Sequence, residues 1–407
     1  MNNAATSTPI EFSDFDPFSL EFRNNPPAYH PQLLQDSPGF MMMEGIPSAY
    51  VAGHAQVMAV LRDWQNFSSV KPKNLPGMER VDFFNSKPVM NYSDPPQHDR
   101  LRKVIQPVFT PRRMQAASDV MQRMIDEILA KVAQNDQVEV TSAITKKLAY
   151  ELLLTHFLGV EEKDHPIFFN YISTLYMLDK LRPGDPKPQA FLDAWDAGAA
   201  YCRSMLKRAE QGGEADTAIG LIYQAMQGDV LSDDEVMAMM ITLLTGGAGT
   251  MGSSAASSLY YIAKNPQIAE RVRQDPAVAK TVLEEALRLD PPVTLVMRFA
   301  TNDVPVGDKV IRKGMPVYVM ISVANRDPSL FPDPDVFSVD RENMRQLSLG
   351  FGVHNCIGGS ITRATVPLLI SAVAERFPNL RIDPEHPEPE WETTPRSRHI
   401  GKAVLLT

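Results

Sequence analysis

The chain has 407 residues, of which 44% are hydrophobic and 22% charged, so it is able to bury a large core. Its 40 basic and 49 acidic side chains leave a net charge of −9, which argues against general nucleic-acid binding, and its two cysteines rule out a disulfide framework. The N-terminus lacks the basic start and apolar run of a signal peptide, and we find no uncharged apolar stretch of membrane-spanning length. We therefore expect a soluble, cytoplasmic protein without a membrane anchor.

Hydrophobic periodicity and turn-forming residues divide the chain into segments. The first 50 residues are mixed and proline-rich, a short strand and a helix are predicted around 50–60, and 71–93 reads as a loop. Helices are predicted at 99–109, 111–134, 143–158, 165–180, 189–211, 233–265, 277–290 and 360–375. Extended segments are predicted at 293–300, in a hairpin formed by 310–311 and 315–322, and at 380–382 and 402–406. This pattern predicts one mainly α unit over residues 1–407 with a small β region.

The most informative motif is the run LGFGVHNCIG at 349–358, which contains His354 and Cys356. Glycines lie six and four residues before this cysteine and two after it. They allow the backbone to approach a planar ligand and to point N–H groups at a thiolate, which lowers the pKa of the thiol. A haem iron held by a thiolate is electron-rich, which favours O–O cleavage. The alternatives are a buried free thiol and a Cys–His nucleophile, although the latter lacks an orienting third group.

Glu285 and Arg288 are three residues apart on one face of a predicted helix. Such a pair by itself is usually a surface ion pair of little value to stability. Here Asp290-Pro291-Pro292 follows, and about fifty residues later comes Arg341. A buried Glu–Arg–Arg cluster is costly unless every charge is paired, so such a cluster specifies a geometry more than it adds stability.

These motifs, together with ANRDP at 324–328 and FPDP at 331–334, resemble the cytochrome P450 superfamily of the soluble bacterial type. The resemblance extends from about residue 90 to the C-terminus. It implies the P450 fold, a triangular prism of helices around a buried haem. It also implies heme b (iron-protoporphyrin IX) with Cys356 as the iron ligand, and a structural role for Glu285, Arg288 and Arg341 beside the haem loop.

The same resemblance assigns ligands to the two haem propionates. His98 and Arg102 are four residues apart at a helix start and share a face. Arginine suits carboxylates because it offers paired hydrogen bonds. With Arg298 and His354, these residues match the family's propionate ligands. An ordinary charged helix start is the alternative for His98 and Arg102, and a core histidine is the alternative for His354.

A glycine-rich segment, ITLLTGGAGTMG at 241–252, lies within a predicted helix. Each of its four glycines costs the helix roughly 1 kcal/mol relative to alanine. A sequence accepts that cost where a helix bends or widens, or where its backbone lies against a ligand. The P450 family usually has A-G-x-(D/E)-T-(T/S) here. This alignment makes Thr250 the catalytic hydroxyl and places Gly249 at the position of the acid and Met251 at that of the second hydroxyl.

The missing acid leaves three routes for protons open. Either water carries them past Thr250 with help from Ser253 or Ser254, or the substrate brings a polar group, or the enzyme uses peroxide. We favour the water relay. A second departure is Leu349, which replaces a phenylalanine that shields the thiolate in relatives. Phe351 could compensate in part, so the tuning of the redox potential is open.

The family's arrangement also implies a substrate-binding region. It would comprise Thr245 and Gly246 one turn before Thr250, and Val293, Thr294 and Val296, with Phe83 and Phe84 in a capping loop. Each of these residues could equally belong to the core. The mix of small, apolar and hydroxyl side chains favours a medium-sized, mostly hydrophobic small molecule with one or two polar groups.

We therefore expect a monomeric haem-thiolate monooxygenase that hydroxylates or otherwise oxidises this molecule with O2. About fifty residues follow Cys356, so we expect no fused reductase and expect electrons to come from an external ferredoxin. A basic docking patch is predicted at Lys103, Arg112, Arg113 and Arg363, with a solvated helix face as the alternative. A peroxide-driven peroxygenase is the nearer alternative function, and a non-catalytic haem-thiolate sensor is the more distant one.

Overall fold

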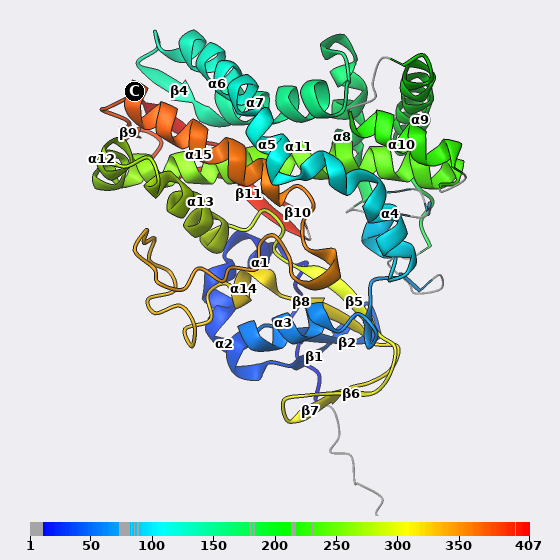
Figure 1. Cartoon of the computed structure of the whole chain (residues 1–407). Coiled ribbons are helices and arrows are strands. Elements are labelled where there is room, and N and C mark those ends of the chain that lie inside the picture. The colour runs from blue at the N-terminus through cyan, green and yellow to red at the C-terminus, as the bar shows by residue number, and fades with distance from the viewer. Residues whose placement is uncertain are drawn as a thin grey trace, which may run out of the picture.

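The computed structural model describes residues 11–407 except 73–81, 83, 85, 88, 179–180, 182–183, 213–216, 229–230 and 395. Most of the chain is helical, and the strands form small sheets, the largest of which lies beside the first helices of the chain (Figure 1). The predicted mainly α architecture with a small β region is confirmed.

The N-terminal segments build the largest sheet together with two strands from late in the chain. These segments are α1 (Leu20–Asn24), η1 (Pro26–Tyr29), α2 (His30–Asp36), β1 (Gly39–Met43), β2 (Ile46–Val51), α3 (His54–Arg62), β3 (Phe67–Ser68) and η3 (Met90–Tyr92). The sheet has the order β1-β2-β8-β5-β3, with β5 at Val296–Ala300 and β8 at Pro316–Val319. Of the four strand pairs described in this sheet, β2 with β8 is parallel and the others are antiparallel.

The side chains of β2 point alternately to the two faces of this sheet, and both faces are buried. Ala49 and Val51 pack into one cluster with Val57 of α3, whereas Tyr50 packs into another with Phe22 of α1. Successive strand side chains point to opposite faces, so a sheet covered on both sides reads as a continuous apolar run. The sheet is therefore a buried platform, and its strand β5 carries residues predicted for the site.

The remaining elements are mostly helices. They are α4 (Gln97–Ile105), η4 (Gln106–Phe109), α5 (Pro111–Ala116), α6 (Ser118–Val132), η5 (Thr141–Thr145), α7 (Lys146–Tyr150), η6 (Glu151–Phe157), η7 (Glu162–Asp164), α8 (His165–Leu178), α9 (Gln189–Glu210), α10 (Ala218–Gln227), α11 (Asp233–Lys264), α12 (Pro266–Gln274), α13 (Val278–Leu289), α14 (Ile321–Ala324), η8 (Gly352–His354) and α15 (Gly359–Arg376). Small sheets pair β4 (Gln137–Glu139), β12 (Val404–Leu406) and β9 (Arg381–Ile382), then β10 (Glu390–Thr394) with β11 (Ser397–Lys402), and β6 (Val304–Val306) with β7 (Lys309–Ile311).

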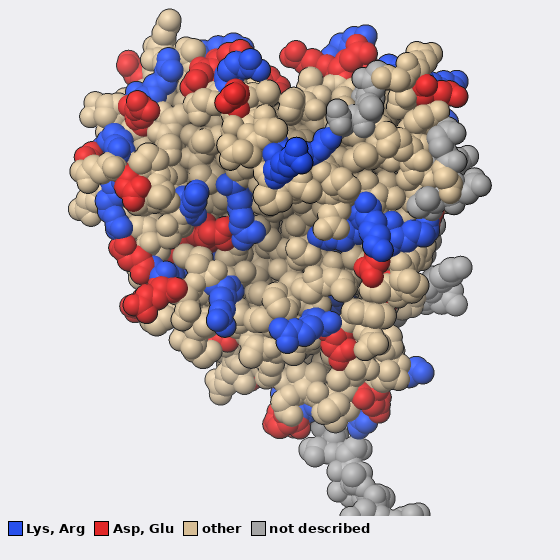
Figure 2. Space-filling view, viewed as in Figure 1, with Lys and Arg blue, Asp and Glu red and all other residues tan. Residues whose placement is uncertain are grey.

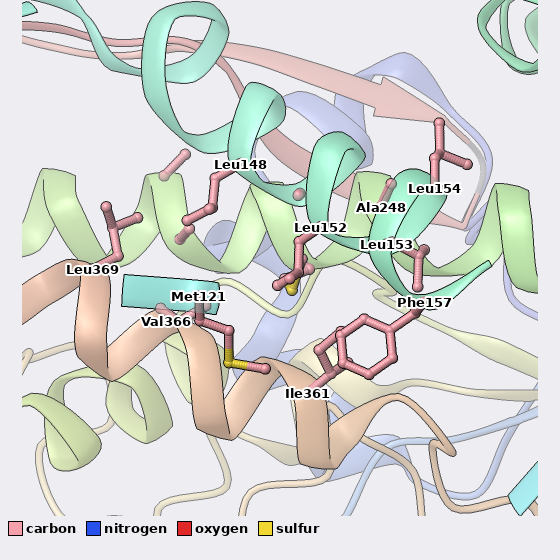
Figure 3. Packing of buried hydrophobic residues seen from close by; sticks show 14 of the residues in the cluster. Met121, Leu148, Leu152, Leu153, Leu154, Phe157, Ala248, Ile361, Val366 and Leu369 are labelled. Atoms are coloured by element: carbon pink, nitrogen blue, oxygen red, sulfur yellow. The ribbon is translucent and has the colours of Figure 1, made fainter. Parts of the chain in front are cut away.

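Helix α11 runs through the centre of the helical part and packs against α7, α13 and α15 (Figure 1). It begins with a capping box in which Ser232 and Glu235 bond each other's backbone N–H groups. Figure 3 shows Leu152 and Leu153 of η6 among buried side chains that include Ala248 of α11 and Ile361 of α15. The large core therefore holds α11 against the helix that follows the cysteine loop.

Helix α11 corrects one expectation. Residues 236–263 carry no charged side chain, and within the described chain this one helix is long and apolar enough to cross a membrane. Three quarters of its most apolar window, 75%, is buried inside the protein, so the environment is that of a core helix. The prediction that the chain has no uncharged apolar stretch of membrane-spanning length was therefore wrong.

Several element boundaries also differ from the predictions. Residues 310–311 pair with β6 across a turn at Gly307, and β8 pairs with β5, so the predicted hairpin is wrong. The helix predicted at 111–134 is interrupted at Ala117, where Ser118 Oγ bonds the Gln115 carbonyl. The segment 143–158 contains two π-helical stretches around α7. Helices α10 and α12 and the β10–β11 hairpin were not predicted.

Candidate functional site

The cysteine loop is a compact turn that ends at α15. The Cys356 N–H donates to the Leu349 carbonyl at 2.7 Å, and the Gly350 N–H donates to Leu347 at 2.8 Å. Gly352 has a φ of 72°, and a Cβ at this position would lie 2.5 Å from the Leu61 carbonyl oxygen of α3. Only glycine satisfies both the backbone angle and this close approach. The loop therefore requires this glycine in order to pack closely against α3.

The surroundings of Cys356 can hold an anionic sulfur. Its side chain reaches solvent, yet protein atoms surround it closely, and this burial raises the pKa of the thiol. Backbone N–H groups of Gly358 and Gly359 and the guanidinium groups of Arg102 and Arg363 lower the same pKa. Burial is the larger effect, so the pKa of the free thiol lies above its usual value and the lowered pKa predicted from the glycines is not found. These donors and cations are what a thiolate ligand needs. Cys202, in contrast, is fully buried in the core, and burial raises the pKa of its thiol to about 12.

A group of basic side chains lies beside the loop. The rings of His98 and His354 are 4.3 Å apart, and His354 Nε2 lies 3.0 Å from Ser69 Oγ. Burial, together with Arg298, His98 and Arg102, lowers the pKa of His354 to about 3. Burial also lowers the pKa of Arg298 to about 10. The structure therefore brings the four side chains predicted as propionate ligands close together, with His354 in the loop itself and the other three in neighbouring segments.

Two observations fit this group to an anionic ligand. Among the described residues, the buried Nε2 of His98 has no hydrogen-bond partner. Arg298 is buried on β5, and its Nη1 donates to the Met297 carbonyl at 2.8 Å. Buried cations and unpaired donors are costly unless an anion compensates them. The two propionates of a haem would supply that charge, so the residues present fit the cofactor.

Arg102 has a second function in the loop. Its Nη1 donates to the Asn355 carbonyl at 2.7 Å, and its Nη2 donates to the Asn355 side-chain oxygen at 3.0 Å. The guanidinium thus holds the residue immediately before Cys356 while it lowers the pKa of the thiol. Its assignment as a propionate ligand stays a prediction.

The Glu–Arg–Arg cluster is formed as predicted. Glu285 and Arg288 are fully buried and share two hydrogen bonds of 2.7 and 2.8 Å, and Arg341 Nε reaches Glu285 Oε1 at 2.8 Å. The other guanidinium nitrogens donate to backbone carbonyls of residues 325–336. Every charge is therefore compensated, which is the condition for such a cluster to persist in a core.

Asn325 connects this cluster to the cysteine loop. Its carbonyl accepts from Arg288 Nη1 at 3.0 Å. Its side chain accepts from the Leu347 N–H at 2.7 Å and donates to Ser348 Oγ at 2.8 Å. Leu347 in turn accepts from Gly350 at the start of the loop. Asn325 lies in the motif ANRDP at 324–328, and nothing in the spacing of that motif indicates these partners.

The glycines of α11 have two different environments. A Cβ on Gly247 would lie 2.3 Å from Leu153 Cδ2, and one on Gly252 would lie 3.4 Å from the backbone of residues 145–146. A Cβ on Gly246 or Gly249 would meet nothing within 4 Å. Gly247 and Gly252 therefore permit close helix packing, while Gly246 and Gly249 leave open space beside the helix. The helix itself stays α-helical throughout, so no break accompanies the glycines.

The hydroxyl groups of α11 bond back to their own helix. Thr250 Oγ1 donates to the Gly246 carbonyl at 2.9 Å and lies 3.2 Å from that of Gly247. Ser253 Oγ donates to Gly249 O, and Ser254 Oγ donates to Thr250 O, each at 2.8 Å. Each hydroxyl therefore uses its proton within the helix and keeps lone pairs that can accept a further bond.

The predicted substrate contacts are placed as follows. Val296 shares a face of β5 with Arg298, because the two are two residues apart in a strand. The Thr294 N–H donates to Arg396 O at 2.9 Å, and Val293 forms a bridge with Ser397. Thr294 also lines a small hollow, whose other residues are Pro17, Phe22, Arg23, Pro26, Ser322, Thr394, Ser397 and Arg398.

The remaining predicted contacts lie in α11 and in the predicted capping loop. Gly246 lies at an exposed position of α11. Thr245 lies in the same helix, although its side chain is outside the described parts, as is Phe83. Phe84 is buried and its ring lies 5.7 Å from that of Tyr92. These residues therefore stay predictions as substrate contacts.

The replacement of phenylalanine by Leu349 has a visible consequence. The Leu349 side chain covers the start of α15, because a Cβ built on Gly359 would lie 3.4 Å from Leu349 Cδ1. The ring of Phe351 instead lies under the Arg62 guanidinium at 5.2 Å, on α3. Phe351 therefore packs against a different element.

The predicted docking residues lie on or next to the face that carries the cysteine loop. Lys103 and Arg112 are exposed, and Arg363 is exposed but paired with Glu284 at 2.6 Å. On this face, lysine and arginine side chains surround the centre, and the acidic ones lie mainly toward the margin (Figure 2). The distribution is suited to a negatively charged partner.

Comparisons with known proteins identify the family of this chain. The family model of cytochrome P450 matches residues 34–402, so the chain belongs to the cytochrome P450 family. Nocardicin C N-oxygenase of Nocardia uniformis is 31% identical over 90% of this chain and 91% of its own length. Cytochrome P450 107B1 of Saccharopolyspora erythraea is 28% identical over 84% of each chain. The structure of the myxobacterial cytochrome P450 CYP267B1 with myristic acid superposes with a TM-score of 0.85 at 23% identity, over 96% of this chain and 98% of that one.

Membership establishes the general chemistry. The chain is an oxidoreductase of the P450 monooxygenase class, and it binds heme b through a cysteine thiolate. Cys356 lies in the loop that resembles the family's haem-binding motif, so it is the residue predicted to supply that thiolate.

Proposed function

We propose that this P450 oxidises a medium-sized, mostly hydrophobic small molecule with O2 and electrons from a separate ferredoxin-type protein. The observation that carries this proposal is the open space beside Gly246 and Gly249, directly next to the Thr250 hydroxyl. Bound heme b would supply oxygen activation, which thiolate ligation favours. In this arrangement Cys356 binds the iron, and His98, Arg102, Arg298 and His354 hold the propionates.

Thr250 would take part in proton delivery through water. Its hydroxyl proton is directed to the Gly246 carbonyl, so its free lone pairs accept from a water molecule. With no side chain at Gly249, water can occupy the space where relatives carry an acid. Ser253 and Ser254 bond the helix backbone in the same way and offer further acceptors. A relay through one or two such waters would keep a proton source within hydrogen-bond reach of the open space beside Gly249.

The absence of an acidic side chain at position 249 favours a second candidate function, a peroxide-driven peroxygenase. Peroxide brings its own protons, so an enzyme that uses it has no need of a carboxylate at position 249. Turnover measured with each oxidant separates the two functions. A ligand screen that follows the spin state of the iron would first identify a substrate.

We expect product to depend on reductant, ferredoxin and O2, with slower turnover on peroxide alone. Consumption of reductant should rise when the substrate is added. If peroxide alone supports full turnover, the peroxygenase is the correct assignment. If no oxidant turns over any ligand that shifts the spin state, a haem-thiolate sensor replaces both.

The external donor would dock on the face around the cysteine loop. Lys103, Arg112, Arg113 and Arg363 are the proposed contacts, because complementary charge speeds the encounter of two proteins. Arg363 also lowers the pKa of the Cys356 thiol, so the proposed surface lies close to the iron ligand.

A further inference from the structure

Two basic side chains converge on Tyr92, and we call these three residues the Tyr92 cluster. The Lys71 Nζ lies 3.5 Å from the centre of the Tyr92 ring, and Arg396 Nη1 lies 3.3 Å from the Tyr92 hydroxyl. The three residues come from separate segments, after β3, in η3 and in the β10–β11 turn. All three are half-buried.

Positive charge dominates the cluster. Burial raises the pKa of the Tyr92 hydroxyl, yet Arg396 and Lys71 together leave that pKa below its usual range. Burial lowers the pKa of Lys71, and Arg396 lowers it further. Asp82 is an acid that acts on Lys71, and it is already bonded to Lys187 at 2.6 Å and to Ser86 Oγ at 2.6 Å.

The cluster lies where two parts of the proposed substrate region meet the propionate group. The Arg396 carbonyl accepts from the Thr294 N–H, which ties the β10–β11 turn to the predicted stretch 293–296. The Tyr92 ring contacts Phe84 of the predicted capping loop. Ser69, two residues before Lys71, contacts His354 of the propionate group. The cluster is thus at the edge of the haem site, on the side where substrate is expected.

Resting on the function proposed above, we propose that the Tyr92 cluster binds the carboxylate of the substrate, which is then a mostly hydrophobic organic acid. Ammonium, guanidinium and phenol groups all donate to a carboxylate, and charge-assisted bonds are the strong ones. The hydrocarbon part would extend toward the open space at Gly246 and Gly249. These side chains have further contacts, so the carboxylate joins a network that already exists.

The test compares acids with neutral molecules of the same shape. Dodecanoic and 4-phenylbutanoic acid, and the primary amide of each, are titrated into the haem-loaded protein. Binding is followed by the spin-state shift and, independently, by calorimetry. The variants are Lys71→Gln, Arg396→Gln and Tyr92→Phe, with Lys71→Arg as the conservative variant. Lys131→Gln and Arg381→Gln at exposed positions are the matched controls.

We expect the acids to bind more tightly than the amides. Lys71→Gln and Arg396→Gln should each weaken the acids by about tenfold, the loss of one charge-assisted bond, and leave the amides unchanged. Tyr92→Phe should have a smaller effect in the same direction, and Lys71→Arg should keep the preference. The two control variants should behave as the parent protein.

Equal binding of acids and amides, or equal weakening of both by the variants, overturns the proposal. The proposal is also overturned if no acid binds to protein whose reduced carbon-monoxide complex shows an intact thiolate ligand. Failure of the proposed function is distinguishable, because the acid preference would then persist in binding without any oxidised product.

Discussion

Gly247 and Gly249 are two residues apart in α11, but a methyl group would meet opposite conditions at these positions. At Gly247 a Cβ would lie 2.3 Å from Leu153 Cδ2, whereas at Gly249 it would meet nothing within 4 Å. Leu153 is buried in the core shown in Figure 3. The same residue type thus serves packing at one position and open space at the other.

The first prediction concerns stability. Gly249→Ala should stabilise the protein by up to about 1 kcal/mol, because alanine is the better helix former and no atom opposes its methyl group. Gly247→Ala should be less stable than Gly249→Ala by about 1–3 kcal/mol, because buried Leu153 must move within a packed core. Denaturant unfolding of the two variants measures the difference. Equal stability of the two would contradict the assignment of these glycines.

The second prediction concerns coupling of electrons to product. Gly249→Glu places a carboxylate in open space beside Thr250, so a larger share of the electrons consumed should appear in product. Gly249→Gln is the matched control, since it has nearly the same size and no titratable group. The ratio of product to reductant consumed measures the effect. The water relay is refuted if Gly249→Glu brings no gain while peroxide alone supports full turnover.

The third prediction concerns the buried ion cluster. Glu285→Gln leaves the buried Arg288 and its neighbour Arg341 without their shared carboxylate. The expected loss is about 3–5 kcal/mol of unfolding free energy, because an uncompensated charge remains in the core. Glu270→Gln, at a solvent-exposed pair with Arg273, should have little effect on the unfolding free energy, because water already screens this pair. Unfolding curves and haem content of the purified variants check both expectations.

The fourth prediction concerns acid sensitivity. His30 is buried, and burial with the nearby Arg326 and Arg398 lowers its pKa to about 3. Below about pH 6.5 the unfolded chain binds a proton at this residue that the folded chain refuses, so stability is lost as pH falls from 6.5 toward 3. His30→Leu should remove this residue's contribution to the pH dependence of the unfolding free energy, which is at most about 1.4 kcal/mol per pH unit.

Unfolding measured from pH 8 down to pH 4 tests this prediction. At pH 8 the histidine is neutral in both states, so the difference between His30→Leu and the parent protein reports packing alone. A difference that stays constant down to pH 4 would show that His30 titrates alike in the folded and unfolded chains.

The fifth prediction concerns the electron donor. Lys103→Glu and Arg112→Glu should each slow association with an acidic ferredoxin, by about tenfold at low salt, because both side chains are exposed on the proposed docking face. The effect should shrink as salt screens the charges. Lys131→Glu near the end of α6 is the control. Stopped-flow reduction of the haem measures the rate, and an equal loss in the control would rule out this docking surface.

Much of the site was predictable because it rests on local patterns. The cysteine loop follows from its glycine spacing, and Gly352 indeed has a left-handed φ and no room for a side chain. Glu285 and Arg288 share a helical face by their spacing alone. The start of α11 at Ser232 and Glu235 likewise follows from a capping pattern of four residues. In each case the sequence determined the outcome, since the interacting groups lie within a few residues of one another.

Only the tertiary structure decided which distant residues meet. It separates the packing glycine Gly247 from the open Gly249, and it places Asn325 between Arg288 and the cysteine loop. It also brings Lys71 and Arg396 to Tyr92 although Arg396 lies more than 300 residues away. Spacing along a chain has no information on such contacts, because the packing of whole helices and turns determines them.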